Sequence, residues 1–449
     1  MTTKKVVVLV DGTWCGPETN TRSNIHCLAN MVGIDPTADN QTYISPTRDV
    51  HARYFPGVGL GGSFMSYLWD GAFATHAKED CNKVYKYIVQ NFASGDEIWM
   101  FGISRGAYVV RSVAGMINNC GIIRDRRNED LIDQVYGLYR SPYPVNKPAS
   151  SEMQNFRRSA SHLVTTPIKF MGLFDTVGSR GIPKLNYDTG VGFEWPEFHD
   201  NLVSSVVEKV YHAIATHDRL WAFQPCLASR DTKKHGTWTD LRIYQTWFPG
   251  THYDLARQEF QFLREKRKGL EGFISSIINY LSGTVTPNDQ LADFVLLWML
   301  SGITSEGGAA IIQYNIEGRV RTINQIMADL RLSLPQRRRG TGDVYGDISH
   351  YLPLGKILSM PLRVVWLFNS TLYQILLNPQ NRVIPDPGNP PSQLVQNEVY
   401  NYTVPNPISG NSIIGDTARV GGLMQQDRRY PSTTFQNYVE YMTATGRLP

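Results

Sequence analysis

The chain has 449 residues, of which 42% are hydrophobic and 19% are charged, as is usual for a globular protein. Its 44 basic and 40 acidic side chains give a formal net charge of +4, which gives no reason to expect a nucleic-acid partner. The five cysteines are odd in number and include no C-x-x-C pair, so we expect a reducing compartment and neither a disulfide framework nor a zinc site. We expect no metal ion and no cofactor.

The first element of the chain is an apolar strand. Residues 6–10 form a continuous branched run, typical of a strand buried on both faces, and turn directly into Asp11-Gly12. The run is too short for the apolar region of a signal peptide, and no stretch of 18 uninterrupted apolar residues follows elsewhere. We therefore expect a cytoplasmic protein without a transmembrane helix, and non-classical export stays compatible with this expectation.

Strands and helices alternate over the first 260 residues. The predicted strands are 6–10, 52–55, 97–101, 167–174 and 241–248. The predicted helices are 24–32, 76–92, a segment from the turn at 102–106 to about 117, 131–139, 152–163 and 201–216. This alternation predicts an α/β fold of three layers, in which helices cover both faces of a mostly parallel sheet.

After about residue 260 the strand pattern fades. Residues 260–281, 290–300 and 322–330 have the pattern of helices, and residues 335–340 are expected to form a loop. From about residue 380 the chain is rich in Pro, Asn and Gly, which predicts little regular structure. We expect a catalytic core at 1–260, a helical region at 261–380 that supplies a cap or substrate-pocket elements, and a surface-wrapping tail at 381–449.

The strongest single motif is Gly-x-Ser-x-Gly at residues 102–106. An apolar strand precedes it and a helical segment follows, which is the context of a nucleophile elbow. At such an elbow the serine hydroxyl is exposed on a sharp turn, and glycines flank it because side chains there would collide with the neighbouring strand and helix. This context favours Ser104 as a nucleophile over a capping serine in a glycine-rich turn.

A serine hydroxyl needs a base, and the base needs an orienting acid. In the α/β-hydrolase order both follow the serine, on loops just past strand ends. Asp175 directly follows one predicted strand, and His252 comes four residues after another. The alternatives are that Asp175 caps a turn and that His252 is a surface histidine. Asp218 and Asp254 are the rival acids.

Backbone N–H groups are expected to hold the oxyanion that forms during attack. One should belong to Arg105, the residue after the nucleophile, and the other to the turn after the first strand, at Gly12 or Thr13. The alternative for this turn is a plain strand ending. The glycine-rich residues 57–62 lack the spacing of a dinucleotide loop, and the basic residues 337–339 fit a solvated loop.

Two strongly apolar segments lie at residues 273–281 and 359–377. Buried helices are one interpretation. The other is a lid or interfacial surface that holds acyl chains, which is compatible with a peripheral contact with a membrane.

Six motifs occur in order, at residues 9–14, 54–59, 102–107, 174–179, 212–215 and 247–254. Together they resemble the α/β-hydrolase domain of type VI secretion lipase effectors, which has bacterial and fungal relatives of unknown role. The resemblance covers about residues 4–260 and implies a triad of Ser104, Asp175 and His252. It departs at residues 255–257, where this chain has Leu-Ala-Arg and the family usually has glycines.

These observations predict a serine esterase or lipase that cleaves a carboxylic ester through an acyl-enzyme, with a phospholipid or other lipid ester as the leading substrate. An acyltransferase, or an esterase for a specialised metabolite, would keep the same fold. A non-catalytic binding module on a hydrolase scaffold is the other alternative. The sequence does not indicate an oligomeric state or which residues bind the substrate.

Overall fold

The computed structural model describes most of the first 343 residues and two parts of the C-terminal stretch. The described residues are 3–12, 15, 21–45, 49–57, 72–177, 184–185, 193–194, 202–219, 224–230, 241–261, 284–316, 319–343, 381–384 and 430–445. No helix among them is both long and apolar enough to span a membrane. The apolar segments 273–281 and 359–377, and Thr13, lie outside the described residues.

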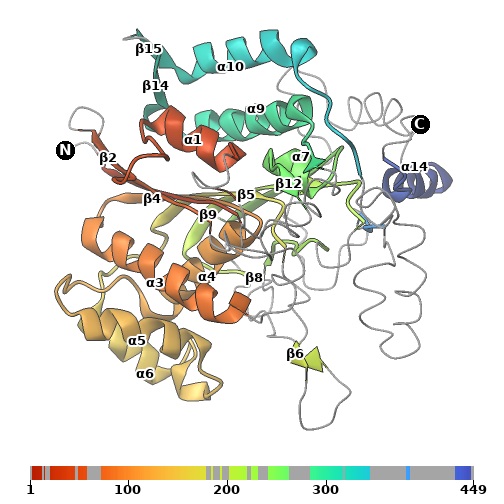
Figure 1. The fold of residues 1–449 in the computed structure, drawn as a ribbon. Coiled ribbons are helices and arrows are strands. Elements are labelled where there is room, and N and C mark those ends of the chain that lie inside the picture. The colour runs from red at the N-terminus through yellow and green to blue at the C-terminus, as the bar shows by residue number, and fades with distance from the viewer. Residues whose placement is uncertain are drawn as a thin grey trace, which may run out of the picture.

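A seven-stranded sheet forms the centre of the molecule (Figure 1). The strands lie in the order β11 (Arg242–Phe248), β9 (Val207–Ala215), β5 (Ile168–Phe174), β4 (Glu97–Ile103), β1 (Lys5–Val10), β3 (Val50–Phe55) and β2 (Thr42–Ser45). All neighbours are parallel except β2, which pairs antiparallel with β3 at the edge. The expected mostly parallel sheet of an α/β fold is confirmed.

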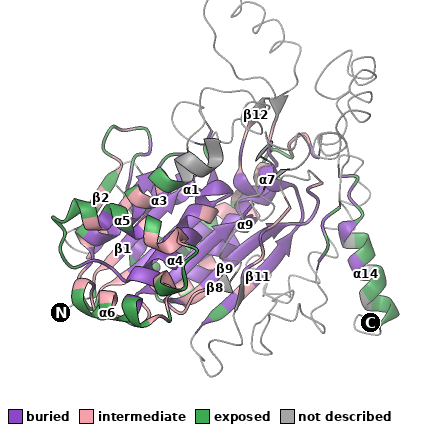
Figure 2. Cartoon of the chain, turned by 90° about the horizontal axis from the view of Figure 1, so that it is seen from below, coloured by how far each residue is buried: buried purple, intermediate pink, exposed green. Residues whose placement is uncertain are grey.

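Helices cover both faces of this sheet, as Figure 1 shows. One layer contains α3 (Ala72–Asn91), α4 (Arg105–Cys120), α5 (Glu129–Arg140) and α6 (Ser151–Ala160), and the other contains α1 (Asn24–Val32), α9 (Asp289–Ser305) and α10 (Ile323–Ser333). Strand β1 shows why its sequence is apolar throughout. Val6 and Val8 pack with the first layer while Val7 and Leu9 pack with the second, so both faces of the strand are buried. Figure 2 shows the inner strands of the sheet as largely buried.

The remaining described elements are short or stand near the C-terminus. They are the pairs β6 (Lys184–Leu185) with β7 (Phe193–Glu194), β8 (Leu202–Val203) with β10 (Ser229–Arg230), β12 (Phe260–Gln261) with β13 (Thr284–Val285) and β14 (Gln313–Ile316) with β15 (Arg319–Thr322), then the 3-10 turns Pro144–Asn146, Ala309–Ile311 and Leu334–Gln336, and the helices α7 (His252–Ala256) and α14 (Thr434–Ala444).

The helix expected at residues 201–216 is wrong, because this segment forms β8 and the central strand β9. Valines at 203, 206, 207 and 210 repeat with helical spacing. In β9, however, Val210 packs with the first layer while Tyr211 and Ala213 pack with the second, so both faces are buried and strand alternation is lost. The exposed edge strand β2 and the helix α14 were not expected either. Residues 260–261, placed in a helix by the sequence, form β12, and the rest of that segment to 281 lies outside the described residues.

Candidate active site

Ser104 stands at a sharp turn between β4 and α4. Its backbone has φ 54° and ψ −117°, a region that residues with a side chain rarely adopt. The glycines on either side allow this turn. A Cβ at Gly102 would lie 2.5 Å from the carbonyl oxygen of Gly106, and a Cβ at Gly106 would lie 2.2 Å from that of Val10. The turn therefore has the geometry expected of a nucleophile elbow.

His252 lies within hydrogen-bond distance of the serine. Its Nε2 is 2.9 Å from Ser104 Oγ, and its side chain is buried. The residue begins α7, directly after the turn that follows β11. Asp254 stabilises this turn, because its carboxylate accepts hydrogen bonds from the backbone N–H and the hydroxyl of Thr251 and from the N–H of Asn288. This rival acid therefore holds the start of α7 through its hydrogen bonds with Thr251 and Asn288.

Asp175 contacts the other nitrogen of the same imidazole. Its Oδ2 is 2.6 Å from His252 Nδ1, and its Oδ1 accepts a hydrogen bond of 2.9 Å from the N–H of Ala215. The residue directly follows β5 with φ 41°, and it is fully buried. Because β4 and β5 are parallel neighbours, Ser104 and Asp175 emerge at the same edge of the sheet.

A third partner of Asp175 comes from the C-terminal part of the chain. Arg382 donates from Nη1 to Oδ1 at 2.7 Å and from Nη2 to Oδ2 at 2.9 Å, and its Nη1 also donates to the carbonyl oxygen of Ala215 at 2.6 Å. Arg382 is 1% exposed. Sequence reasoning did not find this residue, and no motif surrounds it in the Pro- and Asn-rich tail.

The ion pair fixes the protonation state of the acid. Burial alone would raise the pKa of Asp175, but the charge of Arg382 and the hydrogen bonds from His252 and Arg382 outweigh it and hold that pKa well below its ordinary value. An ionised carboxylate can only accept hydrogen bonds, so Nδ1 of His252 carries the proton. In neutral imidazole Nε2 is then an acceptor, and the hydroxyl of Ser104 donates to it.

Asp218, the other rival acid, contacts His252 through the backbone. Its Oδ2 accepts a hydrogen bond of 3.0 Å from the N–H of His252. Burial raises the pKa of Asp218, and the nearby charges of Arg382 and His252 partly oppose this rise. Asp218 therefore helps to place the backbone that carries the imidazole.

Two of the expected oxyanion donors lie among the described residues. Arg105 begins α4 directly after Ser104, so its N–H lies at the positive end of the helix dipole. A Cβ at Gly12 would lie 3.3 Å from Ser104 Cβ, so its backbone is close to the nucleophile, but its N–H donates to Asp11 Oδ1 at 2.8 Å. The Asp11 carboxylate also accepts hydrogen bonds from the hydroxyls of Ser23 and Tyr54, which fixes the turn after β1.

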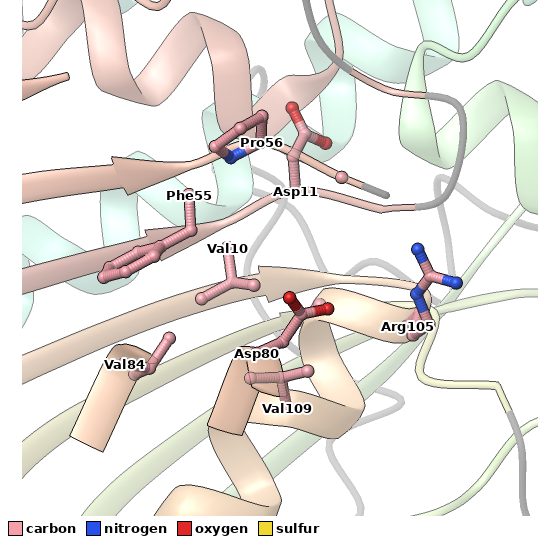
Figure 3. A pocket seen from close by; sticks show the side chains of 10 residues that line it. Val10, Asp11, Phe55, Pro56, Asp80, Val84, Arg105 and Val109 are labelled. Atoms are coloured by element: carbon pink, nitrogen blue, oxygen red, sulfur yellow. The ribbon is translucent and has the colours of Figure 1, made fainter. Parts of the chain in front are cut away.

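A small pocket lies beside the start of α4 (Figure 3). It is lined by Val10, Asp11, Phe55, Pro56, Gly57, Asp80, Val84, Arg105, Gly106 and Val109. Its volume of about 10 Å³ has room for about one water molecule, so it cannot hold an acyl chain. Within the described ranges no group of three or more His, Cys, Asp or Glu side chains could hold a metal ion.

Comparison with known proteins places this chain in a family. Residues 4–302 match the family model of the catalytic domain of Tle1-like phospholipase effectors of type VI secretion systems. The chain belongs to this family. The match confirms the resemblance drawn from the six sequence motifs, and it includes Ser104, Asp175 and His252, whereas Arg382 lies beyond the Tle1-like domain.

Individual relatives are distant. An uncharacterised protein of Saccharomyces cerevisiae, YEL023C, is 27% identical over 241 residues, which are 49% of this chain and 32% of the yeast protein, so the match spans about a third of that relative. The structure of the Tle1 effector bound to the VgrG spike covers 75% of this chain and 81% of its own, with 15% identity and a TM-score of 0.35. An uncharacterised Pseudomonas aeruginosa protein covers 72% and 48%, with 13% identity and a TM-score of 0.35.

Proposed function

We propose that this protein is a serine hydrolase that cleaves carboxylic esters of lipids through an acyl-enzyme on Ser104. The observation that carries the proposal is the continuous chain of contacts from Ser104 Oγ to His252 Nε2 at 2.9 Å and from His252 Nδ1 to Asp175 Oδ2 at 2.6 Å. A non-catalytic scaffold would have no need for this chain, and the strained elbow of Ser104 adds a local cost that catalysis explains.

The reaction divides into acylation and deacylation. His252 Nε2 takes the proton of Ser104 as Oγ attacks the ester carbon, and the carbonyl electron pair becomes an oxyanion that backbone N–H groups stabilise, with Arg105 as the first donor. The negative charge of Asp175 stabilises the imidazolium that forms. The alcohol leaves with the proton from His252. Water then gives a proton to His252 and attacks the acyl carbon. The bond between that carbon and Ser104 Oγ breaks, Oγ takes the proton back from His252, and the acid leaves.

The membership in a family of phospholipase effector domains supports a lipid ester as substrate. The small pocket beside Arg105 does not accommodate acyl chains, so their binding surface must be built elsewhere. The apolar segments 273–281 and 359–377 stay our prediction for that surface.

The test combines covalent labelling with turnover. A fluorophosphonate should label the wild-type chain at Ser104 alone, and Ser104→Ala should abolish labelling and lower turnover of phosphatidylcholine in mixed micelles by several orders of magnitude. Ser112→Ala is the matched control, because Ser112 is a buried serine on the same helix α4, away from the elbow. Labelling that persists in Ser104→Ala would exclude Ser104 as the nucleophile. Turnover of p-nitrophenyl butyrate but not of phosphatidylcholine would exclude the lipid substrate.

A further inference from the structure

The C-terminal part of the chain inserts one buried cation beside the catalytic carboxylate. Arg382 makes three hydrogen bonds, one to each oxygen of Asp175 and one to the carbonyl oxygen of Ala215. A guanidinium presents its N–H groups as a rigid fork that matches a carboxylate, whereas an ammonium provides only a point charge. The contact therefore fixes the plane of the Asp175 carboxylate as well as its charge.

The segment that carries Arg382 is itself anchored. The carbonyl oxygen of Arg382 accepts a hydrogen bond of 2.8 Å from the hydroxyl of Thr434, and Asn381 donates to the hydroxyl of Thr433 at 2.9 Å. These threonines stand at the start of α14. An apolar cluster completes the anchor, and its members come from the strands β9 and β11, from the segment and from α14: Ile214, Trp247, Ile384 and Tyr438.

The charge of Arg382 acts on the coupled pair of Asp175 and His252. When His252 accepts the serine proton, the pair holds a negative and a positive group, and Arg382 disfavours that added positive charge. Two further titratable groups face the pair. Asp218 accepts a hydrogen bond from the backbone N–H of His252. His212 Nε2 accepts a hydrogen bond of 3.3 Å from the N–H of Thr176, and burial lowers the pKa of His212 to about 3, so its ring is neutral.

Charged groups stand farther out on the neighbouring elements. Arg111 of α4 lies near His212, and it donates to the carbonyl oxygen of Cys226 at 2.6 Å. Asp343 lies near Asp218 and is paired with Arg219 at 2.5 Å. Among the described residues, Arg382 is the cation in direct contact with the Asp175 carboxylate.

We propose that Arg382 is a positioning residue, through which the docked C-terminal segment orients Asp175 and sets the pH at which the Asp175–His252 pair releases its proton. The inference rests on the proposed role of this pair in ester hydrolysis. It makes the Tle1-like domain at 4–302 insufficient for full activity, because the group that fixes its acid comes from outside it.

The expected effect of removing the cation has a defined sign. Without the positive charge the Asp175–His252 pair binds its proton more tightly, whichever of the two groups carries it. The midpoint of the acid limb of the pH–activity profile therefore moves to higher pH. A direct charge contact of this kind shifts such a midpoint by about one unit or more. Loss of the fork also frees the carboxylate to rotate, and a misplacement of about 1 Å costs about 100-fold in rate.

The experiment compares three variants of the full chain. Arg382→Met removes the charge and the fork, Arg382→Lys keeps the charge but not the fork, and Val383→Ala is the control at the neighbouring residue, which is 81% exposed. We measure kcat and KM on p-nitrophenyl butyrate across pH. We also follow the titration of the His252 ring by NMR of histidine-labelled protein, assigned with His252→Gln. Thermal unfolding of each variant reports whether the fold persists.

Arg382→Met should lower kcat about 100-fold with little change in KM and raise the midpoint by about one pH unit. Arg382→Lys should restore the midpoint while kcat stays about tenfold low, and Val383→Ala should match wild type. A merely structural residue would change the amount of active protein without moving the midpoint, and that result overturns the proposal. The NMR titration does not need turnover, so the two proposals can fail separately. A wild-type chain that neither reacts with the fluorophosphonate nor hydrolyses the ester would refute the hydrolase. An unmoved titration midpoint of His252 in Arg382→Met would refute the positioning role.

Discussion

Replacing Asp175 with Asn should distinguish the proposed catalytic acid from its rival, Asp218. The carboxylate presents two oxygens, and each accepts two hydrogen bonds: Oδ1 from Ala215 and Arg382, and Oδ2 from His252 and Arg382. An asparagine has one oxygen. If that oxygen takes the place of Oδ1, the NH₂ group takes the place of Oδ2 and faces the N–H donors of His252 and Arg382. His252 then relieves the clash by placing its proton on Nε2, and Ser104 loses its base.

The magnitude follows from these contacts. Loss of the correct tautomer in a serine triad costs about 10⁴-fold in kcat, which corresponds to about 5.5 kcal/mol of transition-state stabilisation. Arg382 also loses half of its charge-paired contact while it stays buried, and breaking a buried ion pair from one side costs about 3 to 5 kcal/mol of stability. Asp175→Asn should therefore be both inactive and less stable.

The assay is steady-state hydrolysis of p-nitrophenyl butyrate together with urea unfolding, with Asp218→Asn as the comparison. Asp218 accepts one hydrogen bond from the backbone of His252, and an asparagine oxygen can accept the same bond. We expect Asp218→Asn to lose no more than about tenfold in kcat, since the imidazole contact is intact. A larger loss for Asp218→Asn than for Asp175→Asn would refute the assignment of the acid.

Two further predictions concern stability. Gly106→Ala places a methyl group 2.2 Å from the carbonyl oxygen of Val10, so α4 must move away from β1, and we expect a loss of at least about 1 to 3 kcal/mol in urea unfolding. Gly137→Ala, with open space around its Cβ on helix α5, should instead gain about 0.5 to 1 kcal/mol, and equal effects would contradict the packing argument. Folding lowers the pKa of Asp175. The contribution of its carboxylate to the free energy of unfolding is therefore complete above about pH 4 and is lost as the pH falls well below that value. The stability difference between wild type and Asp175→Asn should accordingly be constant from pH 5 to 7 and shrink in acid, and a difference that grows in acid would reverse this sign.

The sequence predicted those parts of the site that follow from strand ends. An apolar run that stops at a polar residue marks the edge of a buried sheet, and Ser104 and Asp175 each follow such a run directly. His252 required one more step, because a turn of three residues separates it from β11. The contacts among the three residues then follow from the parallel order of β4, β5, β9 and β11.

Arg382 could not be predicted in this way. Its contact with Asp175 joins residues 207 positions apart, and no periodic pattern or motif links them. The strand β9 was missed for a different reason, since a strand covered on both sides loses the alternation that identifies it. The edge strand β2 was missed for the opposite reason, because it is largely exposed and its sequence carries little apolar signal.

The late position of Arg382 in the chain has a consequence for biosynthesis. Ser104, Asp175 and His252 leave the ribosome well before Arg382 and α14 do, so a nascent chain can form the sheet while its acid still lacks the guanidinium. Domains generally fold as units during synthesis, beginning from the N-terminus. A chain built in this order would gain the Arg382 contact, and with it the full activity proposed above, only after residues 381–384 and α14 have been synthesised and have docked on the sheet.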